Sequence, residues 1–221
     1  WAWDVQPQGA DFEMFRLAFA AYRALRRAGL NIDILPPDVA NLSAYKLVLA
    51  PGLMTISDSL RAALAKFEGI ALVGPRTDTK TDELAIPDVL GPDLPGVDVT
   101  VALTESVPPN ARIKLQGGGR FLHWFEHLEG TATVHLSTRD GQPAIMGEDN
   151  IRYLAGWPDD ATFDRIIGGM CDTLDIPTFE LPDGLRIRDT DTHRFVFNYA
   201  PKAQKWGDVI VPAAGVHWEA L

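Results

Sequence analysis

The sequence predicts an α/β fold, in which an open, mostly parallel sheet with helices on both faces precedes a small β-sandwich. Between residues 11 and 74, segments with helical spacing alternate with short apolar runs through short connections, as in parallel sheets. From residue 96, short alternating segments dominate, and helical spacing returns near residue 159. The remaining residues are strand-like. We therefore expect two domains, residues 1–176 and 177–221.

The first helix is expected over residues 11–28. Its apolar side chains recur three or four positions apart, which is typical of one face of a helix: Phe12, Phe15, Phe19, Tyr22 and Leu25. Asp11 is placed to cap the start of this helix, and Gly29 is placed to end it.

The next segments alternate between strand and helix. Residues 31–35 are expected to form a short strand that stops at Pro36, and residues 45–51 a buried strand. Residues 57–69 are expected to form a helix, and residues 70–74 a third strand. A sheet of this type normally begins with a strand before its first helix, so we expect that strand upstream of Trp1.

The second half contains mainly short strands. Residues 96–106 alternate Val97, Val99, Val101 and Leu103, which indicates a half-buried strand. Further short strands are expected within residues 120–157, and a helix over residues 159–175. Four strand-like segments separated by Pro, Gly and Asp complete the chain, and we expect the domain boundary near residues 176–182.

Composition excludes several kinds of partner. The 221 residues carry a formal net charge of −10, which argues against nucleic acid, because that partner selects for clustered Lys and Arg. The longest apolar runs are too short to cross a bilayer, so no membrane partner is expected. A single cysteine, Cys171, excludes an internal disulfide and fits a reducing, cytoplasmic location. The sequence opens without an initiator Met or a signal segment, so we expect it to be part of a longer polypeptide.

Histidine spacing raises the question of a metal site. His123 and His127 are four residues apart, as in zinc-binding helices, and His135 follows. The segment around them alternates like a strand, and no carboxylate-rich motif completes a ligand set. Half-exposed structural histidines are the favoured interpretation.

Other catalytic groups are incomplete. Glu126 and Glu129 could suggest the carboxylate pair of a retaining glycosidase, but at this spacing on a strand and its following turn they point to opposite faces. Cys171 lies late in an apolar-faced helix, where thiolate is not favoured, so we expect an inert, partly buried thiol. The glycine-rich residues 116–120 precede a strand, which does not suit phosphate binding.

The segment 72–84 is the most polar strand end in the chain. Arg76 and Lys80 could hold an anion or a substrate hydroxyl, and Asp78 and Asp82 could pair with them. The hydroxyls of the segment have no adjacent base, so none is an activated nucleophile: Thr77, Thr79 and Thr81.

Several segments resemble the middle domain of glycoside hydrolase family 42 β-galactosidases, which is called the trimerisation domain. They are WDVQPQGADFEMFRLAFAAYRALRRAGLNIDILPP, YKLVLAP, GPRTDTKTDELAIPDVL and PAIMGEDNIRYLAGW. HRFVFNYAP and GVHWEAL resemble the small C-terminal β-domain of the same enzymes. The most specific pieces are the turn at residues 6–9 with Phe12, and residues 74–77 with Lys80, Ile86 and Pro87.

The resemblance implies a larger enzyme: a TIM barrel, then a flavodoxin-like or class I glutamine amidotransferase-like domain, then the β-domain. The catalytic glutamates belong to the barrel, upstream of Trp1, so no catalytic residue, metal ligand or cofactor site is expected in this chain. The middle domain of the family holds three subunits together. Amidotransferase-like folds keep a reactive cysteine after a core strand, where this chain has Pro75, Arg76 and Thr77.

The resemblance implies that the chain is the non-catalytic trimerisation and C-terminal portion of a β-galactosidase. Its partners would be two further copies of the same protein, in a homotrimer. Galactoside would be bound only through the missing barrel. Arg76, Asp78, Lys80 and Asp82 would then form a structural polar cluster, facing a neighbouring subunit. An alternative is a stand-alone α/β domain that binds a small sugar or anion at its strand ends through Arg76 and Lys80. A weaker alternative is a remnant amidotransferase-like enzyme that uses Cys171.

Overall fold

A computed structural model describes residues 12–221, so the turn predicted at residues 6–9 and the Asp11 cap lie outside the described residues. The chain divides into two compact units. Of the described residues, the first unit contains 12–21 and 35–163, and the second contains 22–34 and 164–221. The helices α1 (Met14–Arg27) and α3 (Asp160–Thr173) each begin in the first unit and end in the second.

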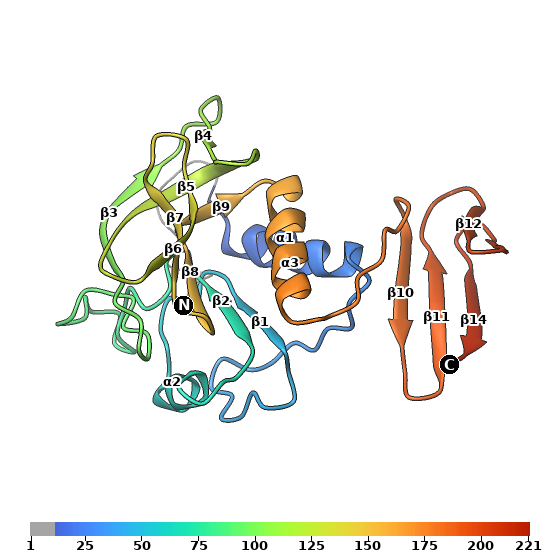
Figure 1. Cartoon of the computed structure of the whole chain (residues 1–221), viewed down its shortest axis with the longest axis horizontal. Coiled ribbons are helices and arrows are strands. Elements are labelled where there is room, and N and C mark those ends of the chain that lie inside the picture. The colour runs from blue at the N-terminus through green and yellow to red at the C-terminus, as the bar shows by residue number, and fades with distance from the viewer. Residues whose placement is uncertain (1–11) are drawn as a thin grey trace. The chain divides into compact units, whose positions relative to one another are not determined.

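The first unit contains a five-stranded sheet with the order β1-β2-β8-β7-β6 (Figure 1). The strands β1 (Leu47–Ala50), β2 (Ile70–Val73) and β8 (Ile151–Leu154) are parallel neighbours. Two antiparallel strands, β7 (Pro143–Gly147) and β6 (Thr133–Ser137), extend the sheet. All four residues of β2 are buried, as expected for a central strand made of aliphatic side chains. The strands predicted within residues 45–51 and 70–74 are confirmed, but β1 is half-buried along its length rather than buried. The sheet is mixed, with three parallel and two antiparallel strands.

A second sheet in the same unit is built on the long strand β5 (Arg120–Glu129). It pairs antiparallel with β3 (Thr100–Ser106), β4 (Ile113–Lys114) and β9 (Gly156–Pro158). The pairing of β5 with β9 shifts in register between Leu122 and Phe125. His123, in this interval, has a φ of 54°. This irregularity breaks the alternation of side chains, and Trp124, Phe125 and Glu126 are consecutively buried.

The helix α2 (Asp58–Leu64) follows the sequence prediction at its start and core. The Ser57 hydroxyl accepts a hydrogen bond from the Leu60 amide at 3.2 Å, which caps the N-terminus. Leu60, Ala63 and Leu64 are buried. The helix ends five residues before the predicted Gly69, and Phe67 in the following turn is buried at 4% exposed.

The predicted apolar face of the first helix is wrong. Phe15, Phe19 and Tyr22 are 59, 46 and 39% exposed, and the buried positions of α1 are Leu17, Ala20, Ala21 and Ala24. Both sets recur at helical spacing, so the pattern alone could not decide which face is buried. Phe12 is buried but precedes the helix.

Two strand predictions also need correction. Residues 31–35 form no strand, and the Asn31 side chain instead pairs with the backbone of Asp189, donating to its carbonyl at 2.9 Å and accepting from its amide at 3.0 Å. Of the alternating residues predicted in 96–106, Val97 and Val99 are buried as expected but precede β3. The alternation fails at Leu103, which is 58% exposed after the register shifts between Val101 and Leu103. The spacing of apolar residues reveals neither a side chain that bonds to a backbone in place of a strand nor a register shift within a strand.

The second unit contains the predicted C-terminal strands. The antiparallel strands β10 (Leu185–Asp189), β11 (His193–Asn198) and β14 (Val216–Ala220) form one sheet, and β12 (Gln204–Trp206) and β13 (Val209–Val211) form a hairpin. Four buried side chains from both pieces form one core, and three partly buried ones pack against it: Leu185, Ile187, Val196 and Val211, with Phe179, Leu181 and Trp206.

Candidate functional site

The segment that leaves β2 is a tight, irregular turn. Gly74, Arg76 and Asp78 have φ values of 93°, 61° and 58°. Residues other than glycine rarely adopt this region of backbone conformation. A Cβ on Gly74 would lie 2.5 Å from the carbonyl oxygen of Leu154, the last residue of β8, so the turn passes close to the end of that strand. The buried Thr77 hydroxyl accepts a hydrogen bond from the Gly74 amide at 2.8 Å. The close backbone approach and this hydrogen bond therefore restrict the conformation of the turn after β2.

A buried carboxylate from the second sheet receives this turn. Glu126 of β5 is 0% exposed, and its Oε1 accepts hydrogen bonds from the Arg76 amide at 3.0 Å and from Trp124 Nε1 at 2.9 Å. The Tyr153 hydroxyl of β8 donates to Oε2 at 2.7 Å. We call Glu126, Arg76, Trp124 and Tyr153 the Glu126 cluster. Because it joins β5 to β8 and to the turn after β2, it fixes the two sheets of the first unit to each other.

The electrostatics of the cluster follow from its burial. Removal from water raises the pKa of Glu126, and the hydrogen bonds from Trp124, Tyr153 and Arg76 oppose that rise. Burial also raises the pKa of Tyr153 well above its ordinary value, with the neighbouring Glu126 charge acting in the same direction. Both groups therefore hold their protons more strongly than they would in water.

The Arg76 guanidinium lies among aromatic rings rather than in a pocket. Its central carbon is 5.6 Å from the centre of the Phe12 ring and 5.7 Å from that of the Trp124 ring, within the range of cation–π attraction. Phe12 in turn packs edge-on against Trp124 and Trp157, with ring centres 5.4 Å apart in both pairs. Burial lowers the pKa of Arg76, and Glu126 and Tyr153 oppose that change.

Asp78 forms a separate polar group on the other side of the turn. Its carboxylate accepts hydrogen bonds from Arg61 of α2, at 3.2 Å to the nearer oxygen, and from the Asp93 amide at 3.0 Å. Arg61 also lies 3.3 Å from the Asp93 carboxylate. We call Arg61, Asp78 and Asp93 the Arg61 clamp. The clamp ties α2 to both ends of the segment between residues 78 and 93.

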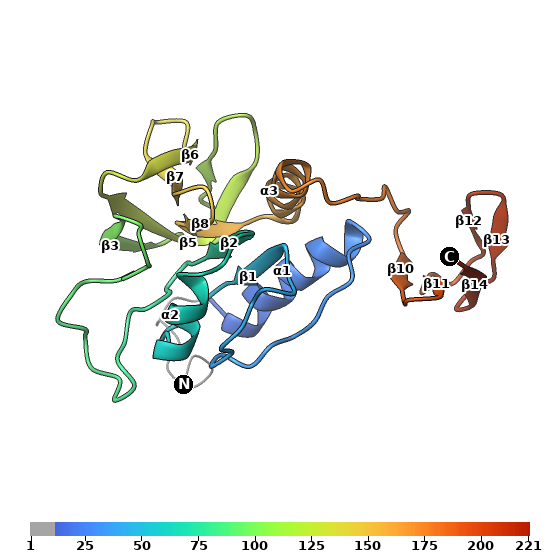
Figure 2. The same cartoon turned by 60° about the horizontal axis from the view of Figure 1, so that its bottom comes forward.

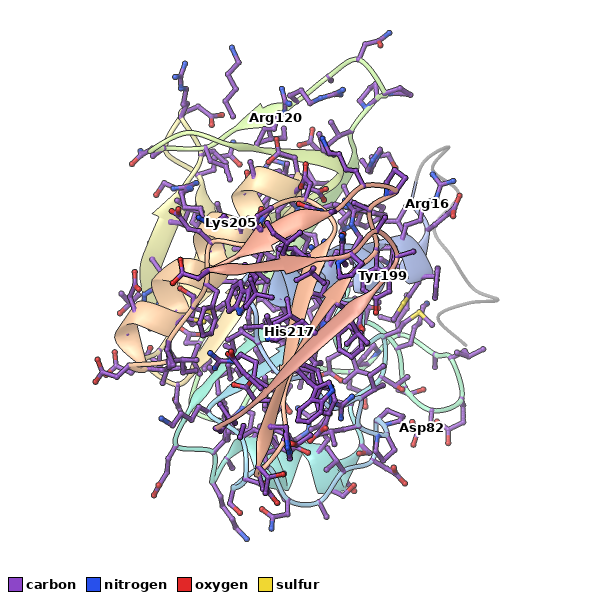
Figure 3. The ribbon with its side chains drawn as sticks, turned by 90° about the vertical axis from the view of Figure 1, so that its right-hand side faces the viewer. Arg16, Asp82, Arg120, Tyr199, Lys205 and His217 are labelled. Carbon is purple, nitrogen blue, oxygen red and sulfur yellow. The ribbon has the colours of Figure 1, made fainter. Side chains whose placement is uncertain are left out.

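Lys80 and Asp82 line a cavity of about 300 Å³ next to the clamp. Asp82 is exposed and its side chain lies at the surface of its loop (Figure 3). The Lys80 amide donates to the Met54 carbonyl at 3.1 Å. The cavity has four carboxylates and two basic side chains in its lining: Asp78, Asp82, Glu83 and Asp93, with Arg61 and Lys80. Arg76 is not part of this lining, so the four residues predicted as one polar cluster divide between the aromatic rings and the cavity.

The catalytic chemistry that this arrangement can support is limited. Glu126 is sealed by its three donors and lies outside the cavity lining, while Glu129 is exposed, so the two do not form a carboxylate pair across a substrate. The hydroxyls of the segment serve the loop itself, since Thr79 donates to the Arg76 carbonyl and Thr81 accepts from the Ala85 amide. The cavity offers charged groups for binding, and the Thr81 hydroxyl in its lining is engaged by the Ala85 amide of the same loop.

The other sequence candidates have structural partners. His127 lies 2.8 Å from Glu105 on the neighbouring strand, and His123 packs edge-on against Trp157. Within residues 12–221, no group of three or more His, Cys, Asp and Glu side chains could hold a metal ion. Cys171 is fully buried in α3, and burial together with Asp172 raises the pKa of its thiol, which disfavours the thiolate.

Sequence reasoning missed Glu126 as the centre of a network. The alternating sequence of β5 predicts that Phe121, His123, Phe125 and His127 lie on one face. The positive φ of His123 and the register shift beside it change which side chains face the interior. The available signal was Glu126 in the interior of a strand rich in large apolar side chains, because a charge that is buried requires partners.

Comparison with known proteins identifies the family. A model of the β-galactosidase trimerisation domain matches residues 1–177. A β-galactosidase of Thermus thermophilus is 35% identical over 208 residues, which cover 92% of this chain and 32% of that protein. A β-galactosidase of Halorubrum lacusprofundi is 29% identical over 229 residues, with 90 and 33% of the two chains covered. The chain thus spans about a third of the length of these relatives.

Solved structures agree with the sequence comparison. The β-galactosidase of the psychrophilic Marinomonas ef1 superposes with a TM-score of 0.90 at 28% identity, covering 97% of this chain and 35% of that one. The Halorubrum lacusprofundi enzyme gives a TM-score of 0.84 at 26% identity, with 97 and 37% covered. In the part of the chain that the structure describes, no helix is long and apolar enough to cross a membrane. The mixed α/β fold, the similarity to β-galactosidases over nearly the whole chain and the family match over residues 1–177 together establish that this chain belongs to the β-galactosidase trimerisation domain family.

Proposed function

We propose that this chain is the assembly and C-terminal portion of a β-galactosidase that hydrolyses terminal non-reducing β-D-galactose residues with retention. The observation that carries the proposal is the family match over residues 1–177, together with β-galactosidases that align with about nine tenths of this chain and extend well beyond it. In this proposal the catalytic carboxylates belong to a barrel outside these 221 residues, and the chain contributes subunit contacts.

The chemistry of the candidate site supports a structural role. The buried carboxylate of Glu126 is used by backbone and aromatic donors, and Arg76 packs between rings. Such a network holds a strand end in place and offers a substrate no accessible reacting atom. We propose that Arg76, Asp78, Lys80 and Asp82 are structural residues and that none of them touches galactoside.

Finer features of the proposal concern fold and assembly. We propose a flavodoxin-like or amidotransferase-like ancestry for residues 1–176, supported by the parallel strands β1, β2 and β8 and by the sharp turn after β2, where such folds keep a nucleophile. Residues 177–221 are proposed as a separate small β-domain. The parent is proposed to be a homotrimer, and its cytoplasmic location remains a prediction from the single cysteine.

The alternative function, binding of a small sugar or anion through Arg76 and Lys80, has weaker support. Only Lys80 of these two lines the cavity, and the carboxylates there outnumber the basic groups. An anion would therefore enter a predominantly acidic site.

The proposal is tested on the full-length product of the gene. Hydrolysis of a chromogenic β-galactoside and a molar mass of three subunits by light scattering are expected. An active enzyme that is monomeric would contradict the assembly role, and a trimer without this activity would contradict the substrate assignment.

A further inference from the structure

The long connection between β2 and β3 is the feature that the proposed function leaves unexplained. Residues 81–93 contain turns and bends but neither helix nor strand, and we call them the association loop. Connections of this length without regular structure are uncommon in compact domains and are usually functional or disordered. Figure 2 shows the loop in green, extending away from the strands that it connects.

The two ends of the association loop are fastened together. The Arg61 clamp joins Asp78, before the loop, to Asp93, at its end. Gly91 lies so close to Asp78 that a Cβ on it would be 2.2 Å from the Asp78 carbonyl oxygen, and its own carbonyl accepts from the Val101 amide at 3.1 Å. A loop closed at its base in this way samples fewer conformations than a free segment of the same length.

The first turn of the loop is also internally bonded. The Thr81 amide donates to the Ala85 carbonyl at 3.0 Å, and the Ala85 amide donates to the Thr81 hydroxyl at 3.2 Å. The Leu84 amide donates to the Thr81 carbonyl at 2.9 Å. The segment that follows this turn is therefore presented in a defined position, which reduces the entropy that binding must overcome.

The tip of this fastened loop is apolar and exposed. Ile86, Val89 and Leu90 are 71, 68 and 58% exposed, and these three aliphatic residues lie within five positions. The acidic side chains of Asp82, Glu83 and Asp88 flank them and are exposed as well. Several large apolar side chains exposed close together in sequence, with charged residues among and beside them, are typical of a protein–protein contact.

We propose that the tip of the association loop binds a second copy of this chain and forms part of the trimer interface. This inference rests on the proposed function. The loop lies within residues 1–177, the part matched by the trimerisation domain, so a second copy is the partner that the family itself supplies. In a closed ring of three, each interface joins two different surfaces. The loop of one subunit therefore contacts a different surface of the next subunit, and the Arg61 clamp holds it in position for that contact.

The test compares two double variants in the full-length gene product. The loop variant carries Ile86→Ser and Leu90→Ser, and the control carries Leu103→Ser and Val134→Ser, which alter similarly exposed aliphatic residues on β3 and β6. All four side chains are exposed, so circular dichroism and melting temperature should remain those of the unmodified protein. Light scattering over a dilution series then measures the trimer.

The loop variant should dissociate at a protein concentration at least about tenfold higher than the unmodified protein, because removal of central apolar contacts weakens an interface strongly. The control should remain as trimeric as the unmodified protein. Any other pattern among the two variants overturns the assignment of the loop and leaves the proposed function intact. A monomeric unmodified protein would instead refute the proposed self-association, and the assignment with it.

Discussion

At the scale of single residues, the central feature is a buried carboxylate whose hydrogen-bond donors are all uncharged groups. Glu126 accepts one backbone, one indole and one phenol hydrogen bond, and the nearby Arg76 guanidinium provides additional attraction. Desolvation nevertheless dominates and raises the pKa of Glu126. The charged form is therefore held in place at some cost in stability.

This cost predicts a pH dependence for Glu126→Gln. Because the folded pKa lies above the unfolded value near 4.5, the folded state keeps a proton that the unfolded state has lost, so stability falls as pH rises through this interval. Glutamine does not titrate, can still accept from Trp124 and Arg76, and can donate to the Tyr153 hydroxyl. In urea unfolding between pH 4 and pH 8, the stability of Glu126→Gln relative to the unmodified chain should increase with pH. A constant difference would show that Glu126 has an ordinary pKa.

Removing the carboxylate altogether should be much more damaging than neutralising it. Glu126→Ala leaves three buried donors without their acceptor, at a cost of about 1–3 kcal/mol for each unsatisfied group. We expect a loss of at least about 3 kcal/mol by urea unfolding at pH 7, while the exposed Glu129→Ala should change stability by less than about 0.5 kcal/mol. Equal effects of the two substitutions would refute the buried network.

At the scale of elements, the turn after β2 depends on glycine for two separate reasons. Gly74→Ala places a Cβ on a residue of positive φ and brings it 2.5 Å from the Leu154 carbonyl oxygen. Gly96→Ala places a Cβ on a residue with a φ of 72° and meets nothing within 4 Å, so it measures the conformational cost alone. We expect a loss of about 1 kcal/mol for Gly96→Ala and a clearly larger loss for Gly74→Ala in urea unfolding. Similar losses would mean that the backbone at the end of β8 shifts at no cost to relieve the contact.

The Arg61 clamp gives a second prediction at this scale. Asp78 and Arg61 have side chains that are 10 and 28% exposed, so their ion pair is shielded from solvent more than a surface pair. Asp78→Asn should lower the free energy of unfolding by about 1–3 kcal/mol, because a charge-assisted hydrogen bond is weakened. Asp88→Asn, in the exposed part of the same loop, is the control and should have an effect below about 0.5 kcal/mol. If the Arg61 clamp does not stabilise the fold, the two variants will have the same free energy of unfolding.

The elements that could be predicted from sequence are those with one unambiguous apolar pattern. The strand β2 is continuously aliphatic, and α3 has Phe163, Ile167 and Met170 on one buried face, as expected. The buried face of α1 differs from the expected one because two sets of residues share helical spacing, and the size of an aromatic side chain does not decide which set is buried. The irregularity at His123 changes which side chains β5 buries, and it depends on pairing with β9 rather than on local sequence.

The same limit applies to the candidate site. The position of the polar turn after β2 followed from the pattern of the strand and from Gly74 and Pro75. The partners of its residues did not follow, because Glu126 is 50 residues away from Arg76 along the chain. Contacts between distant segments are created by the packing of two sheets, which local periodicity does not encode.

At the scale of the whole molecule, we propose that catalysis and assembly belong to different parts of a longer enzyme. The described residues provide a buried polar network, an acidic cavity and a fastened loop, and the two carboxylates Glu126 and Glu129 do not form a pair across a substrate. Relatives with β-galactosidase names are about three times as long as the matched region. The central claim is that this chain alone does not catalyse hydrolysis.

The most direct test of that claim is to incubate the purified 221-residue chain, shown to be folded by circular dichroism, with a chromogenic β-galactoside at high protein concentration. We expect no release of the chromophore above the spontaneous rate, and the same result for Glu126→Gln. Turnover by the chain that is abolished in Glu126→Gln would contradict the account, because it would place a catalytic carboxylate within the proposed assembly portion.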